Sequence, residues 1–308
     1  MKDHYSSPQD IELCRKIHKA HGTTYYYSTR RFPASIRWRV HGLYAFVRIA
    51  DEWVDNPDGI EPCQQRNLIE TWRKEMVAGV AGKCPNHPVL RVFCDAFREC
   101  DMPIREAHCF LDAMLMDIDR RRYASFNELR HYMRGSASAV GILMCSAMGV
   151  TCDEEIVESA KALGEAMQLT NFLRDIGEDY LRGRIYLPQE DMERFGVDEL
   201  GIAQKCCTPA FKKLMRYEIA RARDLYCESD RGIDSLPSQI RRPVLLARTL
   251  YAKILDKIEE QGYDVFTQRA RTTKCEKIWA AAKVTVRPRQ AKIRTSRTEV
   301  ARPTAPKQ

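Results

Sequence analysis

The sequence predicts an all-α protein built as a single domain. In most windows apolar residues recur at the spacing of a buried helix face, whereas the alternating pattern of a half-buried strand is rare. Glycine and proline are few, with 15 and 14 among 308 residues, so the helical windows are seldom interrupted. No fixed-period repeat and no linker-like stretch divides the chain. We therefore expect one helical domain over residues 1–283, followed by a basic tail at 284–308.

Eight long helices are predicted in chain order, each from its apolar spacing and from the turn-forming residues that stop it. The first four cover residues 36–54, 63–80, 89–100 and 104–119. Their stop signals include Asn-Pro-Asp-Gly at 56–59, Cys-Pro at 84–85 and Asp-Met-Pro at 101–103. The next two helices cover 126–148 and 153–180, before Gly149 and Gly183. The last two cover 208–227 and 242–261, and Gly262 follows the second.

The net charge of +8 is concentrated at the carboxyl terminus. Residues 284–308 hold Glu299 as their one acidic residue, against seven basic ones: Arg287, Arg289, Lys292, Arg294, Arg297, Arg302 and Lys307. This segment therefore carries +6 of the charge and the rest of the chain +2. A nucleic-acid-binding protein needs a basic face on its folded part, so no nucleic-acid partner is expected. The tail is predicted to be solvated, with a modest attraction to anionic membrane lipid as the alternative.

Three further observations concern the cellular compartment. The most apolar stretch, residues 139–150, is too short to span a bilayer and is interrupted by Gly141 and Ser146. Residues 1–17 lack the hydrophobic core of a secretion signal. The 12 cysteines form no CxxC pair, so no zinc site is expected and the thiols are predicted to be reduced. The protein is therefore expected in the cytoplasm.

A polar stripe runs along the otherwise apolar segment 41–55. At about 100° per residue, four of its polar residues fall within roughly 60° of Arg48; they are His41, Tyr44, Asp51 and Asp55. A solvated face is the usual explanation of a charged stripe. The other sides of this segment, however, carry Leu43, Phe46, Val47, Ile49, Trp53 and Val54. A helix surrounded by protein in this way more plausibly turns its charged stripe toward a cavity.

A second stripe of the same kind lies in segment 168–179. Gln168, Asn171, Asp175 and Asp179 share one side of the predicted helix, with Arg174 at the edge of that side. Aspartates four residues apart are common by chance on exposed helices, so one stripe alone is weak evidence. Two such stripes on two hydrophobic helices are much stronger evidence for a polar site.

Carboxylates that face one another across an apolar cavity would repel and partly take up protons unless cations compensate. Oxygen ligands favour hard ions, and Mg²⁺ typically links one or two carboxylates to a substrate phosphate while keeping several waters. The stripes therefore predict Mg²⁺, with Mn²⁺ as an alternative, and a phosphorylated substrate. An isoprenoid diphosphate suits such a site, because its chain fills an apolar interior while the metal stabilises the departing diphosphate.

With these residues in view, the sequence resembles the squalene and phytoene synthase family, and within it the bacterial phytoene synthases. The run Asp-Glu-Trp-Val-Asp at 51–55 is similar to the first aspartate-rich motif of that family. The run at 171–179 is similar to the second, and Arg-Gly-Arg-Ile-Tyr-Leu-Pro at 182–188 continues the match. Glu52 stands where many members have a second aspartate, and we interpret it as a tolerated change. The likeness covers roughly residues 18–279 and implies an isoprenoid-synthase-like bundle around a central apolar cavity.

The resemblance also implies roles for individual residues. Asp51, Asp55, Asp175 and Asp179 would hold Mg²⁺, supported by Gln168 and by Asn171 as a further metal ligand. The diphosphates would be contacted by Thr24, Arg48, Arg174 and Arg271. The substrate-binding residues that the resemblance implies also include His21, Gln168, Asn171 and Tyr251. Arg269 is a second candidate for the arginine assigned to position 271. Tyr44 and Tyr132 would face the carbocation, where a ring face stabilises positive charge and a hydroxyl can relay a proton.

The implied reaction is the head-to-head condensation of two geranylgeranyl diphosphates, through prephytoene diphosphate, to phytoene. The alternative within the family is a dehydrosqualene or squalene synthase that acts on farnesyl diphosphate. A non-catalytic relative acting as a lipid-binding or assembly factor is a third hypothesis. The chain contains no GxG, so no NADPH is expected. Because substrate and product are lipids, we expect peripheral association with the inner face of the membrane, with downstream carotenoid enzymes as protein partners.

Overall fold

The computed structural model describes residues 4–55, 59–151 and 153–286, and all regular secondary structure within these ranges is helical. The predicted all-α class is therefore confirmed. In chain order the elements are α1 (Pro8–His21), α2 (Thr23–Thr29), α3 (Ala34–Asp55), α4 (Pro62–Val80), α5 (Pro88–Cys100), α6 (Ile104–Asp119), α7 (Phe126–Met133), the π-helical segment η1 (Arg134–Ala139), α8 (Val140–Ala147), α9 (Glu154–Leu181), α10 (Gln189–Phe195), α11 (Glu199–Ala203), α12 (Pro209–Ser235), α13 (Ser238–Glu260) and α14 (Lys274–Val286).

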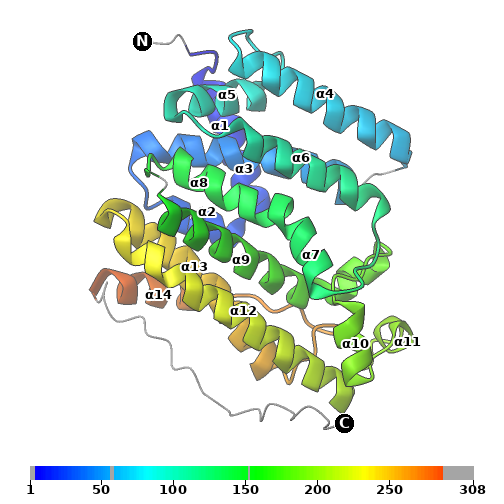
Figure 1. Ribbon diagram of the computed structural model, residues 1–308. Helices are drawn as coiled ribbons and strands as arrows, with labels where there is room; N and C mark the ends of the chain where they lie inside the picture. The colour runs from blue at the N-terminus through cyan, green and yellow to red at the C-terminus, as the bar shows by residue number, and fades with distance from the viewer. Residues whose placement is uncertain (1–3, 56–58, 152, 287–308) are drawn as a thin grey trace.

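The helices of the bundle lie side by side, with α9 in contact with α8, η1, α12 and α13. Helix α3 packs against α1, α5 and α8, so α8 is in contact with both α3 and α9. Figure 1 shows α4 and α5 at one edge of the bundle and α12–α14 at the other, with α3, α8 and α9 between them. The two helices that carry the predicted polar stripes therefore both lie in the interior layers of the fold.

The long helices begin where side chains satisfy their free backbone N–H groups. Asp153 accepts a hydrogen bond from the backbone N–H of Ile156 at the start of α9, and Thr208 does the same for Phe211 at the start of α12. Gly183, with φ of 78°, supplies the left-handed conformation just beyond the end of α9. These local signals set the length of α9, and hence the distance over which it can line a cavity.

The predicted helix at 126–148 is helical from Phe126 to Ala147, but it is not a regular α-helix. Residues 134–139 form η1, which packs against α6 and α9. A Cβ atom on Gly135 would lie 2.2 Å from the carbonyl oxygen of Cys109, and one on Gly164 would lie 2.5 Å from that of Ala137. These two glycines allow the backbones of α6, η1 and α9 to approach this closely. The prediction of a regular helix at 126–148 did not include the π-helical segment.

Other helix boundaries differ from the prediction by up to eight residues. Helix α12 continues to Ser235, and α13 begins at Ser238 with Pro243 inside it. Helices α1, α2, α10, α11 and α14 were not among those predicted. The last of these ends at Val286, and the predicted basic tail lies almost entirely outside the described residues.

Apolar packing fixes α3 in the bundle. Phe46 is fully buried and stacks on Phe93 with ring centroids 4.0 Å apart, while Trp72 and Phe110 contact the same cluster. Burying a side chain of this size contributes about 1.5–3 kcal/mol. Because Phe46 faces the core, the stripe on another side of α3 is held in a defined direction. Among the described helices, none is both long enough and apolar enough to cross a bilayer.

Candidate functional site

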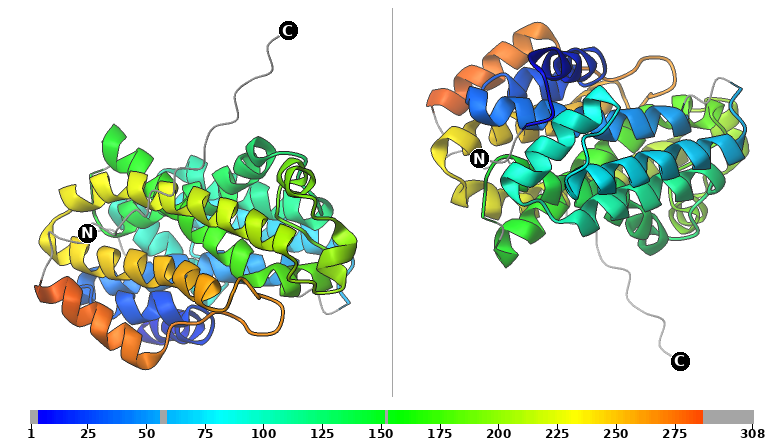
Figure 2. Two further views of the ribbon diagram at one scale, coloured as in Figure 1. Left: turned by 90° about the horizontal axis from the view of Figure 1, so that it is seen from below. Right: turned by 90° about the horizontal axis from the view of Figure 1, so that it is seen from above.

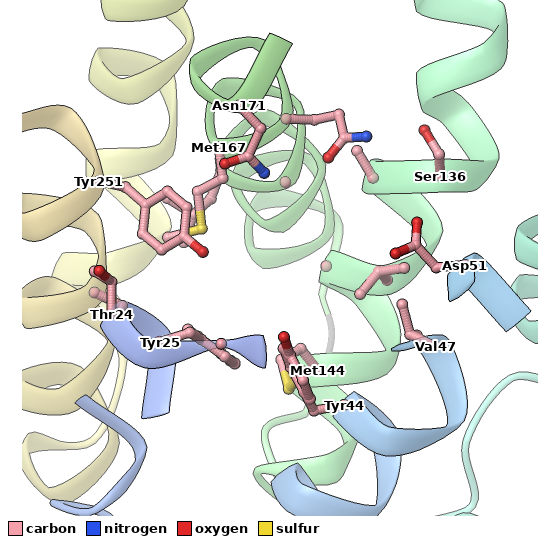
Figure 3. Close-up of a pocket in the computed structure, with 18 of the residues that line it drawn as sticks. Thr24, Tyr25, Tyr44, Val47, Asp51, Ser136, Met144, Met167, Asn171 and Tyr251 are labelled. Carbon is pink, nitrogen blue, oxygen red and sulfur yellow. The ribbon is translucent and has the colours of Figure 1, made fainter. Parts of the chain in front are cut away.

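A cavity of about 790 Å³ lies between α3 and α9 and is also lined by residues of α2, η1, α8 and α13. In Figure 3, the side chains of Asn171, Tyr251, Thr24 and Asp51 surround this open space from α9, α13, α2 and α3. The cavity is therefore assembled from segments distant in sequence, as the two stripes predicted.

The character of the cavity changes along α9. Ile156, Leu163 and Met167 line it in the first part of the helix, and Asn171 and Asp179 in the second part. Since an α-helix rises 1.5 Å per residue, positions 156 and 179 are roughly 35 Å apart. The lining thus runs from an apolar part to a carboxylate-bearing part over a length that suits a long lipid chain with an anionic head.

The residues to which a role was assigned all line this one cavity, whereas His41 of the first stripe does not, because it is buried with its Nδ1 atom 2.9 Å from that of His18. The residues with an assigned role are His21, Thr24, Tyr44, Arg48, Asp51, Asp55, Tyr132, Gln168, Asn171, Arg174, Asp175, Asp179, Tyr251 and Arg271. Arg269 lines it too, so both arginine candidates are in place. The placement brings the predicted set together, while the role of each residue stays a prediction.

In the first stripe, each aspartate is approached by an arginine. Arg48 donates hydrogen bonds to Asp51 and to Glu52, one turn away on the same helix. Arg184 donates to Asp55 over 2.6 Å from the segment that follows α9. Burial, and then the charge of Asp55, raise the pKa of Asp51 to about 7. The negative charge on this stripe is therefore only partly balanced by the chain itself.

Beneath the first stripe is a buried polar network that sequence reasoning did not identify. The Arg184 side chain is 4% exposed and lies 3.5 Å from the equally buried carboxylate of Asp117. Tyr186 donates its hydroxyl proton to Asp117 over 3.0 Å. Two sequence signals were available: Asp117 is a carboxylate directly between Met116 and Ile118, and both of its partners belong to the run at 182–188. Because Arg184 also donates to Asp55, its pairing with Asp117 helps to fix the position of the Asp55 carboxylate.

In the second stripe, the two aspartates differ sharply. Asp175 accepts hydrogen bonds of 2.8 Å from Arg174 and from both the Nε and Nη2 atoms of Arg269. Burial alone would raise the pKa of Asp175, but these arginines hold it below its usual value. Asp179 has Arg182 at 3.7 Å. Burial, followed by the charges of Asp175 and Asp55, raises the pKa of Asp179 to about 8.

The influence of Asp55 on Asp179 shows that the stripes of α3 and α9 act on each other electrostatically across the cavity. Within the described part of the chain, no three His, Cys, Asp or Glu side chains are close enough together to hold one metal ion. The donor set nevertheless consists of carboxylate and amide oxygens, which suit a hard divalent cation. Two of its carboxylates, on Asp51 and Asp179, have pKa values that an added cation would lower.

The predicted tyrosines, Tyr44 of the first stripe and Tyr132 of α7, line the cavity with neutral side chains. Tyr132 is buried, and burial raises its pKa well above the usual value. Burial likewise raises the pKa of Tyr44, whose ring stacks on that of His18 with centroids 3.9 Å apart. Both hydroxyls therefore keep their protons, and an aromatic ring in the lining can stabilise a positive charge in the cavity.

Comparison with known proteins gives consistent matches. Residues 18–276 match the family model described as squalene/phytoene synthase. The chain is 36% identical to the phytoene synthase of Arthrospira platensis, over 84% of this chain and 87% of that protein. It is 34% identical to the 15-cis-phytoene synthase of Synechocystis, over 86% and 81%. Among solved structures, a dehydrosqualene synthase bound to a ligand superposes with a TM-score of 0.83 at 29% identity, over 90% of this chain and 96% of that one.

Proposed function

Because the chain belongs to the squalene/phytoene synthase family and is a prenyltransferase, we propose that it is a phytoene synthase that condenses two geranylgeranyl diphosphates head to head. The resemblance to this family is confirmed, and the match to enzymes throughout the chain argues against the non-catalytic hypothesis. The identity of the substrate, the metal and the mechanism are parts of this proposal.

The observation that carries the proposal is the change in lining along α9. One cavity combines carboxylates and arginines in one part, such as Asp175 and Arg174, with apolar side chains such as Leu163 and Met167 in the other. An isoprenoid diphosphate has the same division into an anionic head and an apolar chain. Water that reached an allylic cation would quench it, so an apolar lining also protects the reaction.

The carboxylates of Asp51, Asp55, Asp175 and Asp179 and the amide of Asn171 are the residues that would hold Mg²⁺, or Mn²⁺ in its place. Mg²⁺ commonly takes only one or two protein carboxylates and completes its shell with water and substrate phosphate, so a pre-assembled cluster of three is not needed. Bound there, the metal would supply positive charge that stabilises the departing diphosphate.

The side chains of this protein would bind and orient the substrate diphosphates and shield the reacting carbons from water. Arg48, Arg174 and Arg271 lie in the same lining as the aspartates and offer charge-assisted hydrogen bonds to diphosphate oxygens. His21 and Thr24 lie in that lining as further donors. As the carbon–oxygen bond of one substrate breaks, its diphosphate leaves and its allylic carbon bonds to the double bond of the other substrate. Loss of one proton then closes the cyclopropane ring of prephytoene diphosphate. Loss of the second diphosphate, rearrangement and release of one proton then give phytoene.

Product analysis tests this proposal. Purified protein is incubated with Mg²⁺ and with geranylgeranyl or farnesyl diphosphate in turn, with and without NADPH, and the hydrocarbon is identified by chromatography and mass spectrometry. We expect phytoene from geranylgeranyl diphosphate without NADPH. A thirty-carbon hydrocarbon from farnesyl diphosphate, with geranylgeranyl diphosphate left unchanged, would contradict the proposed substrate.

The second candidate is dehydrosqualene synthesis from farnesyl diphosphate, and the likeness to a solved dehydrosqualene synthase favours it. The sequence matches favour phytoene synthases, since several relatives with that name are over 30% identical across most of the chain. Both candidates use the same cavity. We also propose peripheral association with a membrane, because substrate and product are lipids and no helix in the described residues spans a bilayer.

A further inference from the structure

Helix α14 exposes an apolar stripe on the outside of the bundle. Ile278 and Trp279 are 64% and 66% exposed, and Cys275 and Ala282 are exposed as well. At about 100° per residue these four residues fall within a sector roughly 100° wide. Figure 2 shows α14, in orange and red, at the outer surface of the molecule. We refer to these four residues as the α14 stripe.

The rest of α14 explains its orientation. On the opposite face, Ala280, Ala281 and Val284 are buried in an apolar cluster that includes residues of α13. Lys274 and Lys283 lie at the two borders of the stripe. Glu276, the one acidic residue of the helix, forms an ion pair of 2.8 Å with Lys257. The stripe is therefore apolar along its centre and positively charged along its sides.

We propose that the α14 stripe inserts into the surface of a bilayer that contains anionic lipid. A helix that presents a tryptophan and other apolar side chains between lysines has the composition of a helix lying in the membrane interface. Residues 287–308, which follow it in the sequence, carry seven basic residues and one acidic residue, so the adjoining charge suits the same anionic surface.

A second copy of the chain is a poorer occupant of this stripe. Stable interfaces bury about 800 Å² on each partner, which is more than four side chains of one helix supply. A two-fold pairing of α14 with itself would also bring the lysines along its borders, Lys274 and Lys283, close to those of the other copy. A lipid surface has neither requirement.

The inference rests on the proposed function, because it places the reaction cavity beside its lipid supply. Lys277 of α14 lines the cavity together with Arg271 and Thr272 in the preceding segment. A bilayer in contact with the α14 stripe would thus lie next to a wall of the cavity. A lipid substrate could then pass from the membrane without crossing bulk water.

Vesicle flotation tests the inference with the full chain. The probes are vesicles of phosphatidylcholine with and without phosphatidylglycerol, and the variants are Ile278→Ser combined with Trp279→Ser, and Leu200→Ser. Leu200 is 61% exposed on α11 and serves as the matched control. We expect the wild type and Leu200→Ser to float with anionic vesicles, and the double variant to bind about tenfold more weakly or worse. Unchanged thermal unfolding of the double variant shows that it is folded.

Two results would overturn the inference: wild-type protein that stays off anionic vesicles, or a double variant that binds as the wild type does. A wild-type dimer that the double variant dissociates would also overturn it, because the stripe would then be a subunit contact. Product formation in detergent micelles, which need no docking, tests the proposed function separately. Wild-type protein that floats with vesicles but yields no condensed hydrocarbon in detergent would refute that function while supporting the docking surface.

Discussion

In the aspartate pairs of α3 and α9, the two members share similar surroundings but differ in how closely arginines balance their charge. On α9, Asp175 is held by Arg174 and Arg269, whereas Asp179 has a single, more distant arginine at 3.7 Å. On α3, Asp55 is held by the buried Arg184, whereas Asp51 shares Arg48 with Glu52. In each pair, therefore, the chain commits an arginine to one aspartate more fully than to the other.

The pKa values follow this difference. The pKa of Asp175 is lowered by its arginines, while burial and neighbouring carboxylates raise those of Asp51 and Asp179 to about 7 and about 8. A buried carboxylate that lacks a full partner costs stability unless a cation arrives. Asp175, whose charge is balanced by arginines, therefore also stabilises the fold. Asp51 and Asp179 are the aspartates whose negative charge a bound cation would stabilise.

The largest expected effect separates activity from stability within the α9 pair. Asp179→Asn should reduce kcat/KM by about 10³-fold or more, because the variant loses a proposed metal-binding carboxylate. In metal-free buffer its free energy of unfolding should equal or exceed that of the wild type, because an unbalanced buried carboxylate is gone. Steady-state kinetics over a range of Mg²⁺ and urea unfolding without metal provide the two measurements.

Asp175→Asn is the matched variant for this experiment. It should lose activity to a similar degree but also lose stability, because Arg174 and Arg269 would keep their charges without the carboxylate between them. If both variants unfolded at the same urea concentration, the distinction drawn between the two aspartates would be wrong.

Arg184→Met tests how much the buried pair of Arg184 and Asp117 beneath α3 contributes to stability. Because Asp117 would be left buried without its cation, we expect the free energy of unfolding to fall by about 3 kcal/mol. Combining Arg184→Met with Asp117→Asn should restore part of that loss, since the unpaired charge is then removed as well. Denaturant unfolding of the two variants decides the matter, and a double variant no more stable than Arg184→Met would speak against this network.

A smaller effect distinguishes the two arginines after α13. Arg269→Gln removes the hydrogen bonds to Asp175 and should lower the free energy of unfolding by about 2 kcal/mol as well as weaken diphosphate binding. Arg271→Gln should raise KM roughly tenfold with little change in stability, if its role is confined to the substrate. The two responses would be reversed if Arg271 were the residue that organises the second stripe.

Local patterns were sufficient to predict the all-α class and most of the stripe residues that line the cavity, whereas His21, Thr24, Tyr132, Tyr251 and Arg271 were assigned from the family resemblance. Helical spacing identified α3 and α9, and the positions of Asp51 and Asp175 on them followed from about 100° per residue. Contacts between distant segments were beyond this reasoning. The pairing of Arg184 with Asp55 joins residues 129 positions apart, and no periodicity in either segment predicts it.

The π-helical segment η1 was missed for a related reason. Its geometry reflects how closely Gly135 and Gly164 let neighbouring backbones approach, which depends on α6 and α9 being in place. Helix α14 was also not predicted, and neither was the exposure of Trp279 on its outer face. Tertiary packing and the choice of partner for each charge are the parts that required the three-dimensional structure.

An effect on stability no larger than that of Arg269→Gln is expected at Asp10, an aspartate outside the cavity that is bonded to an arginine and to the start of a helix. Asp10 accepts hydrogen bonds of 3.0 and 2.9 Å from Arg91 and one of 2.9 Å from the backbone N–H of Ser7, and together, with Arg91 as the largest cause, these bonds lower its pKa from 3.8 to about 2. Because the folded-state pKa is the lower one, the pair stabilises the protein above about pH 4, and that contribution disappears as the pH falls toward 2. Asp10→Asn should therefore cost about 2 kcal/mol at pH 7 and progressively less below pH 4. Urea unfolding of both proteins across this range measures the difference; a gap that stays constant with pH would mean that packing, rather than the charge pair, accounts for the loss.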